Sequence, residues 1–427
     1  MGKLSVSFVV CSVLAMLFWV GDTQPLHAGD RGFITLPNPV FVTSVTGTGD
    51  FSTWADTGGV SGLIGADMVC RARALAAGLD NANLFVAWLS DSSDDAYCRI
   101  HQMSGTKASN CGGLPSLPSF AGPWVRTDGH PFGEKIFLLL GIHGVVYIPA
   151  LLDEYGARAP SPYVFTGTDT FGQYIAGTSA ACSDWTSADL LTVQAGRTVR
   201  TTQSWGSFGT KTCNAPYPIV CMLPDDGPAL TPLYNQGALA FVTNSDGLGR
   251  LEDWPEAGGY QGLAAADNIC LLRAMAAGLP HPEEFKAWLS TSTVNATDRF
   301  TFGGPWVRPD GVIVAHTKAE LISGELHAPI NQSASGEYLA NLGVWTGSSA
   351  TGAGSGIDCN DWTSDDGGDS GTAGAANAID DWYQAWSSYP CSGTASLYCL
   401  SSIHSAIRVF LDGFETGDLT SWSVTQP

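Results

Sequence analysis

The sequence is poor in charged residues, and basic residues are the scarcer kind. Lysine and arginine together number 19, against 40 aspartate and glutamate residues, and the formal net charge is -21. Proteins that bind nucleic acid neutralise phosphates with clusters of lysine and arginine. The composition therefore argues against a nucleic-acid partner.

Long apolar runs are also missing, apart from one at the N-terminus. Residues 4–20 are almost entirely apolar, follow Lys3 and precede small or polar residues. This pattern is typical of a secretory signal peptide, which we expect to occupy residues 1–28. No later stretch approaches the roughly 18 consecutive apolar residues that a membrane-spanning helix needs. The sequence therefore predicts a secreted protein, extracellular or at the cell surface, without a membrane span.

Closely spaced histidines are a third absence. No two histidines stand at the helical or strand spacing that is typical of a zinc site. Between the expected signal peptide and the tail, histidines are scattered at His101, His130, His143, His281, His316 and His327. The sequence therefore predicts no cofactor of this kind.

What the chain does contain is an internal repeat. A shift of 200 residues brings residues 41–43 onto 241–243 and residues 87–90 onto 287–290, with many identities between them. Further on, Gly-Pro-Trp-Val-Arg at 122–126 returns at 304–308, where the shift is 182. The repeat predicts two copies of one domain, at residues 38–223 and 238–402, joined by a linker at 224–237. A C-terminal tail at 403–427 lies outside both copies.

The change of shift means that the first copy carries an insertion of 18 residues. Cys111 lies inside this insertion and Cys98 just before it, and neither cysteine has a counterpart in the second copy. A disulfide between Cys98 and Cys111 is the simplest pairing. Eleven cysteines are present in all, and removal of Cys11 with the signal peptide leaves an even ten, as paired cysteines in an exported protein require.

Each copy opens with a pattern that predicts a strand followed by a helix. Residues 41–43 form a short β-type run, and apolar residues from Leu63 to Ala77 fall on one helical face before Gly78. A second short helix is expected at residues 85–90 and again at 282–290. The remainder is rich in glycine and serine, and the fold class expected is α+β with much irregular structure.

The order of the cysteines resembles that of the C-type-lectin-like fold. The closer resemblance is to a bacterial family of endostatin-like domains, as in leptospiral surface proteins. It rests on motifs such as Ala-Trp-Leu-Ser, Gly-Pro-Trp-Val-Arg-x-Asp-Gly, Trp-Thr-Gly at 345–347 and Cys-x-Asp-Trp-Thr-Ser. The first copy departs from the family, because Phe165 replaces the tryptophan of Trp-Thr-Gly. The resemblance implies two tandem C-type-lectin-like domains and four further bridges: Cys70 to Cys221, Cys182 to Cys213, Cys270 to Cys399, and Cys359 to Cys391.

Two clusters in the second copy are candidates for a ligand surface. An acidic loop supplies carboxylates, and aromatic residues crowd the segment before Cys391. The candidate ligand-binding residues are Trp345, Asp361, Asp365, Asp366, Asp369, Trp386 and Tyr389. Calcium is possible at Asp361, Asp365 and Asp369, although the six to eight oxygens that calcium prefers are not evident and the calcium motifs of sugar-binding lectins occur in neither copy.

The resemblance implies an extracellular binding or adhesion protein that recognises a protein or glycan, and not an enzyme. Two alternatives stay open. A secreted hydrolase could use Ser370, which lies in a Gly-Asp-Ser-Gly match, or paired carboxylates, although a serine nucleophile also needs a histidine base. A structural component of an envelope or matrix is the other. The sequence does not fix the ligand or the oligomeric state.

Overall fold

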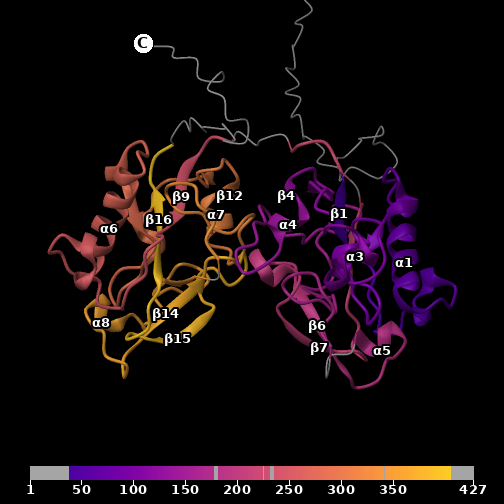
Figure 1. Ribbon diagram of the computed structural model, residues 1–427. Coiled ribbons are helices and arrows are strands. Elements are labelled where there is room, and N and C mark those ends of the chain that lie inside the picture. Colours follow the sequence, from indigo (N-terminus) through magenta and orange to yellow (C-terminus); the bar gives the residue numbers. More distant parts are fainter. Residues whose placement is uncertain (1–37, 177–180, 225, 231–234, 341, 405–427) are drawn as a thin grey trace, which may run out of the picture. The chain divides into compact units, whose positions relative to one another are not determined.

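The computed structural model describes residues 38–404, except for 177–180, 225, 231–234 and 341. The expected signal peptide and the tail from residue 405 onward lie outside the described residues. Helices and strands are mixed in both copies, which confirms the expected α+β class (Figure 1). No helix in the described part of the chain is both long and apolar enough to cross a membrane.

The two copies share one order of elements, except that α2 and α3 of the first copy have no α-helical counterpart in the second. The first copy contains β1 (Pro39–Val42), α1 (Gly62–Ala76), β2 (Val86–Ala87), α2 (Ala96–Arg99), α3 (Asn110–Gly113), β3 (Trp124–Arg126), β4 (Pro131–Gly133), α4 (Ile136–Leu139), β5 (Tyr163–Phe165), α5 (Ala181–Trp185), β6 (Thr192–Arg197), β7 (Gly209–Thr212) and β8 (Val220–Met222). The second contains β9 (Ala238–Val242), α6 (Gly262–Ala276), β10 (Phe285–Ala287), β11 (Trp306–Val307), β12 (Ile313–Ala315), α7 (Lys318–Leu321), β13 (Gly343–Trp345), α8 (Cys359–Trp362), β14 (Ser370–Ala375), β15 (Trp386–Pro390) and β16 (Ser396–Ser401).

The strands of the second copy form one eight-stranded sheet, in the order β12-β11-β9-β16-β13-β14-β15 with β10 also pairing with β16. In the first copy the same strands form separate sheets of five and three, which a single bridge between Phe165 and Ile219 connects. Pro218 explains the difference, because it stands where β16 has Ser396 and a proline has no N–H to add to a strand pair.

The first strand of each copy is buried on both faces. Phe41 in β1 packs into the cluster that contains Cys70 of α1, whereas Val40 and Val42 pack with Trp88 on the other face. Alternation of side chains along a strand produces this division. The helix expected from the apolar face is also present, since α1 ends just before Gly78, whose φ is +71°.

The second helix expected in each copy is wrong. Residues 82–84 form one turn of 3₁₀ helix, and the following residues form β2, which pairs with β8 in an antiparallel register. The second copy repeats this arrangement with β10 and β16. Phe85, Ala87 and Leu89 are fully or almost fully buried. Their spacing of two is the period of a strand, but a run this short cannot be distinguished from a helix by sequence.

All five expected disulfides are present. They join Cys70 to Cys221, Cys98 to Cys111, Cys182 to Cys213, Cys270 to Cys399, and Cys359 to Cys391. In each copy the longest bridge ties the helix to the last strand, and a second bridge ties the Cys-x-Asp-Trp loop to the end of the strand hairpin. The third bridge of the first copy, between Cys98 and Cys111, closes its insertion. The bridges therefore hold in place the loops that carry the candidate ligand residues.

The described residues belong to one compact unit, in which the two copies contact each other through equivalent segments. Arg200 of the first copy forms a β-bridge with Ala378 of the second. On either side, the Thr201 N–H donates to the Asn377 carbonyl (2.9 Å), and the Ile379 N–H donates to the Val199 carbonyl (3.2 Å). Each half of this contact repeats the other, so the interface is close to two-fold symmetric.

Candidate functional site

A small pocket opens at the edge of the sheet in the second copy. Its volume is about 280 Å³, and Trp386 and Tyr389 of β15 form its aromatic wall. Trp386 is 44% exposed, and its ring centroid lies 6.0 Å from that of Tyr389. The other lining residues are Asp246, Leu342, Gly343, Thr394, Ala395 and Ser396. We call this the Trp386 pocket.

Two polar groups of the Trp386 pocket have no partner among the described residues. Ser396 is 1% exposed, and its hydroxyl makes no hydrogen bond there. Asp246 lies at the surface, and no described residue hydrogen-bonds or ion-pairs with its carboxylate. A buried hydroxyl that is left unpaired costs free energy unless a ligand or water satisfies it. The pocket therefore offers an exposed acceptor, the Asp246 carboxylate, beside an aromatic wall, and the unpaired Ser396 hydroxyl is buried among its lining residues.

Trp345 does not belong to this surface, which corrects its place among the candidate contacts. Its side chain is fully buried, and its indole N–H donates to the Gly247 carbonyl (3.0 Å). The strand β13 that carries it pairs with β14 on one edge and β16 on the other, and the Trp345 ring packs 5.7 Å from that of Trp362. The Trp345 ring packs 5.3 Å from that of Tyr389 and supports the pocket wall from beneath.

The counterpart of the Trp386 pocket in the first copy is built differently. Tyr163 stands where the second copy has Gly343, and Lys211 pairs at the position of Tyr389. The Lys211 ammonium lies 3.4 Å from the centre of the Tyr163 ring. Pro218 replaces Ser396, so the first copy has neither the aromatic pair nor the hydroxyl.

The carboxylates of the acidic loop in the second copy accept local hydrogen bonds. Asp361 accepts from the Ser292 backbone N–H (2.7 Å) and hydroxyl (3.0 Å). Asp184 of the first copy accepts from Ser92 in the same way. Because the Asp361 bonds occupy both oxygens and recur in the first copy, this aspartate serves to tie two loops together.

The other three loop aspartates also have partners. Asp365 forms an ion pair with Arg250 (2.7 Å), and Asp366 accepts from the Gly368 N–H (2.8 Å). Asp369 accepts from the Asn360 side chain (2.9 Å). Over the described residues, these carboxylates do not converge on a common point that could hold an ion. The loop is better described as a solvated, internally bonded surface.

Ser370 of the Gly-Asp-Ser-Gly match lies at the start of β14. Its hydroxyl oxygen accepts a hydrogen bond from Ser388 (2.9 Å), and within the described part of the chain no histidine bonds to it. A serine nucleophile needs such a base to remove its proton.

Sequence reasoning missed a group of histidines that the fold brings together. His316, Glu320 and His327 each offer a ligand atom, and these atoms lie within 4.8 Å of one another. The ring of His130, from the first copy, has its centroid 5.2 Å from that of His327. His316 and Glu320 stand four residues apart, a spacing that could have indicated this pair, whereas the approach of His130 depends on contact between the copies.

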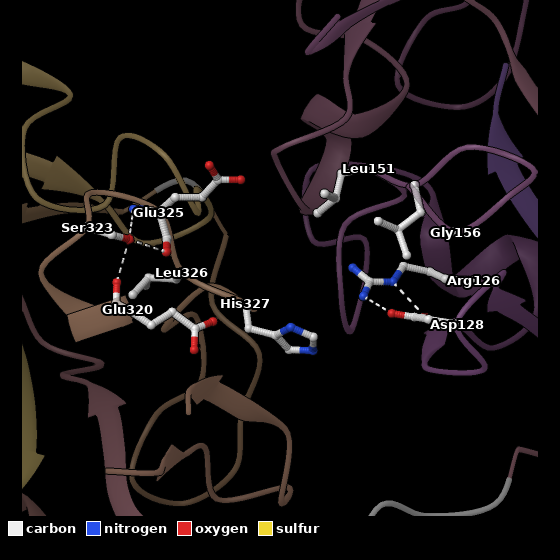
Figure 2. Close-up of a pocket in the computed structure, with 10 residues that line it drawn as sticks. Arg126, Asp128, Leu151, Gly156, Glu320, Ser323, Glu325, Leu326 and His327 are labelled. Carbon is white, nitrogen blue, oxygen red and sulfur yellow. Dashed lines mark hydrogen bonds and ion pairs between the residues drawn. The ribbon is translucent and has the colours of Figure 1, made fainter. Parts of the chain in front are cut away.

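A cavity of about 400 Å³ adjoins these histidines. Glu320, Glu325 and His327 of the second copy line it together with Arg126 and Asp128 of the first (Figure 2). Arg126 hydrogen-bonds to Asp128, so the guanidinium faces a carboxylate. Burial alone would raise the pKa of Asp128, but bonds from His130 and Arg126 outweigh it and hold that pKa well below its ordinary value.

Comparison with known proteins identifies no family: no family model matches the chain, and no curated protein matches it. The function is therefore inferred from the pockets and their residues.

Proposed function

We propose that this chain is an exported binding protein made of two tandem C-type-lectin-like, endostatin-like domains, and that the second domain binds a glycan in the Trp386 pocket. The cysteine order and the shared motifs favour this family. Five disulfides suit an oxidising, extracellular environment. The proposed role is recognition without turnover.

The observation that carries the proposal is the combination of an exposed aromatic wall with unpaired polar groups. The apolar face of a sugar ring packs well against tryptophan and tyrosine, which supply rigid contact area. The exposed Asp246 carboxylate can then accept hydrogen bonds from the ring hydroxyls. Few ligand classes other than sugars present an apolar face bordered by so many hydroxyls.

The size of the pocket limits the ligand. Small-molecule sites usually measure roughly 300 to 1,000 Å³, and this pocket, at about 280 Å³, lies just below that range. It therefore suits one terminal sugar ring of a larger glycan rather than an extended chain. Contacts of a single ring are few, so binding to a glycan surface would gain from several copies of the protein.

The first copy takes a supporting part in this proposal. Its equivalent position holds the Tyr163 ring with the Lys211 ammonium above it, and Pro218 cannot donate a hydrogen bond. The two copies therefore do not share one ligand specificity.

The test is a glycan array probed with the full chain and with Trp386→Ala. Removal of a central aromatic contact costs about 2 kcal/mol or more, which corresponds to a loss of affinity of at least roughly 30-fold. Tyr260→Ala is the matched control, because Tyr260 is 54% exposed but lies on the loop before α6 and outside the pocket. Binding that survives Trp386→Ala unchanged would refute the proposed site.

A further inference from the structure

His316, Glu320 and His327 are held close together by the local fold of the second copy. His316 follows β12, and Glu320 lies in the short helix α7. The His327 N–H donates to the carbonyl of Val314 (2.8 Å), which fixes the segment after α7 alongside β12. The three side chains therefore project from segments that are bonded to one another.

Glu320 is already oriented toward His316. One carboxylate oxygen accepts from the His316 backbone N–H (2.7 Å) and lies 2.9 Å from the His316 Nδ1. At its other end, the Glu320 backbone N–H donates to the Thr317 hydroxyl (3.1 Å), which caps the helix. This pair needs little reorganisation to serve as two ligands of one ion.

His327 supplies the observation that points to a ligand. Its Nε2 atom is buried and has no hydrogen-bond partner among the described residues. A buried imidazole nitrogen that lacks a hydrogen-bond partner is available to bind a metal ion.

His130 approaches the same place from the first copy. Its Nδ1 lies 3.2 Å from an oxygen of Asp128, so a carboxylate orients the ring. Metal-bound histidines are commonly held in this way, with the second ring nitrogen directed at the ion. Asp128 also faces Arg126, which reduces the repulsion between that arginine and a cation.

We propose that His316, Glu320, His327 and His130 form a binding site for a zinc-type divalent cation, with Asp128 as the residue that positions His130. Three imidazoles and one carboxylate favour zinc over calcium or magnesium, which prefer oxygen ligands. Ligands about 2.1 Å from a tetrahedral ion lie about 3.4 Å apart, so small side-chain rotations close the present spacing of up to 4.8 Å among His316, Glu320 and His327. The His130 ring, whose centroid lies 5.2 Å from that of His327, has to turn toward them to become the fourth ligand. With four protein ligands the ion is structural.

This site joins the two copies, because His130 belongs to the first and the other ligands to the second. Its ligands do not include any residue of the Trp386 pocket. The inference is therefore independent of the proposed glycan binding, and either can fail alone.

The test is calorimetric titration of the full chain, prepared without an added histidine tag, with zinc chloride. We expect one equivalent to bind and His327→Ala or Glu320→Gln to weaken it at least roughly 100-fold. His130→Ala and Asp128→Asn should weaken zinc binding about 10- to 100-fold, as removal of a residue that positions a ligand commonly does. Circular dichroism checks that each variant is folded, and Glu320→Gln keeps the size of the side chain.

The matched control is His281→Ala. His281 also has a carboxylate near its Nδ1, at 3.6 Å from Glu283, but no third ligand group includes it within the described residues. Cobalt in place of zinc should give the strong visible absorption of a tetrahedral site, and His327→Ala should abolish it. Failure to bind zinc, or binding that only His281→Ala weakens, overturns the site. Binding that His130→Ala leaves unchanged overturns the link between the copies.

Discussion

Gly343 and Tyr163 occupy equivalent positions in the two copies, each at the start of a strand and opposite the last residue of the next. Gly343 pairs with Ala375, and Tyr163 pairs with Arg197. In the second copy the missing side chain leaves room beneath Trp386. The Trp386 pocket therefore exists because this position holds glycine.

Gly343→Tyr should close the Trp386 pocket without unfolding the domain. A Cβ at this position would lie 3.7 Å from the Trp386 ring and 3.8 Å from the Ala395 Cβ, which are ordinary contacts. The tyrosine ring would then occupy the space that we assign to a sugar. We expect glycan binding to fall at least as far as in Trp386→Ala, with thermal unfolding changed by only a few degrees.

Gly343→Ala is the control for this variant, since a methyl group fits the same space. Array binding that tolerates alanine but not tyrosine would support the pocket. Equal binding by all three proteins would contradict it.

The ion pairs between the copies allow a second prediction. Asp381 accepts from both Arg197 (2.9 Å) and Arg200 (2.7 Å), and these arginines are only 12% and 10% exposed. Asp381→Ala leaves two largely buried cations with weaker partners, so we expect a loss of about 1 to 3 kcal/mol in the free energy of unfolding. Urea denaturation measures it.

Asp365→Ala is the matched control, because Asp365 and its partner Arg250 are each 37% exposed. An exposed pair contributes less than about 1 kcal/mol. If both variants lose the same free energy of unfolding, burial does not increase the contribution of the Asp381 ion pairs.

The sequence predicted the features that depend on local residue patterns or on comparison of the two copies. The repeat, β1, α1 and the exposure of Trp386 follow from such patterns. Four of the disulfides were implied by the resemblance to the C-type-lectin-like fold, and the Cys98–Cys111 bridge followed from the insertion in the first copy. It failed where tertiary contacts decide: residues 86–87 become a strand because β8 offers an edge, and Trp345 is buried because its ring packs against those of Trp362 and Tyr389.

The histidine group shows the limit most clearly. His130 and His316 are far apart in the chain and lie in segments that the repeat does not make equivalent. Neither their sequence spacing nor the repeat therefore predicts that they lie close together. Only contact between the copies brings them together.

Acid should destabilise the first copy through His101. This residue is 2% exposed, and burial lowers the pKa of its imidazole below the ordinary 6.5, although a bond to the Tyr97 carbonyl acts in the opposite direction. As the pH falls below 6.5, the unfolded chain takes up a proton that the folded chain resists. Stability is therefore lost with falling pH, by at most about 1.4 kcal/mol per pH unit for this group.

His101→Gln should reduce that slope, since glutamine does not titrate and can still donate to the Tyr97 carbonyl. Urea denaturation at pH 7.5, 6.5 and 5.5 gives the comparison. The exposed His143 provides the control, and His143→Gln should leave the slope unchanged. A slope that His101→Gln does not alter would place the acid sensitivity elsewhere.

The disulfides should differ in their contribution according to the length of chain that they close. Cys270 and Cys399 are 129 residues apart, and Cys98 and Cys111 only 13. On the chain-entropy model these loops correspond to about 5 and about 3 kcal/mol. The double alanine variants, C270A/C399A and C98A/C111A, remove similar buried volume in both cases, so urea denaturation of the two reports mainly the difference in unfolded-state entropy. The shorter bridge also closes an insertion that the second copy lacks, so its loss should loosen residues 98–121 and leave the sheet intact. A larger loss for the short bridge than for the long one would mean that strain or packing in the native state, rather than loop closure, sets the contribution of these bonds.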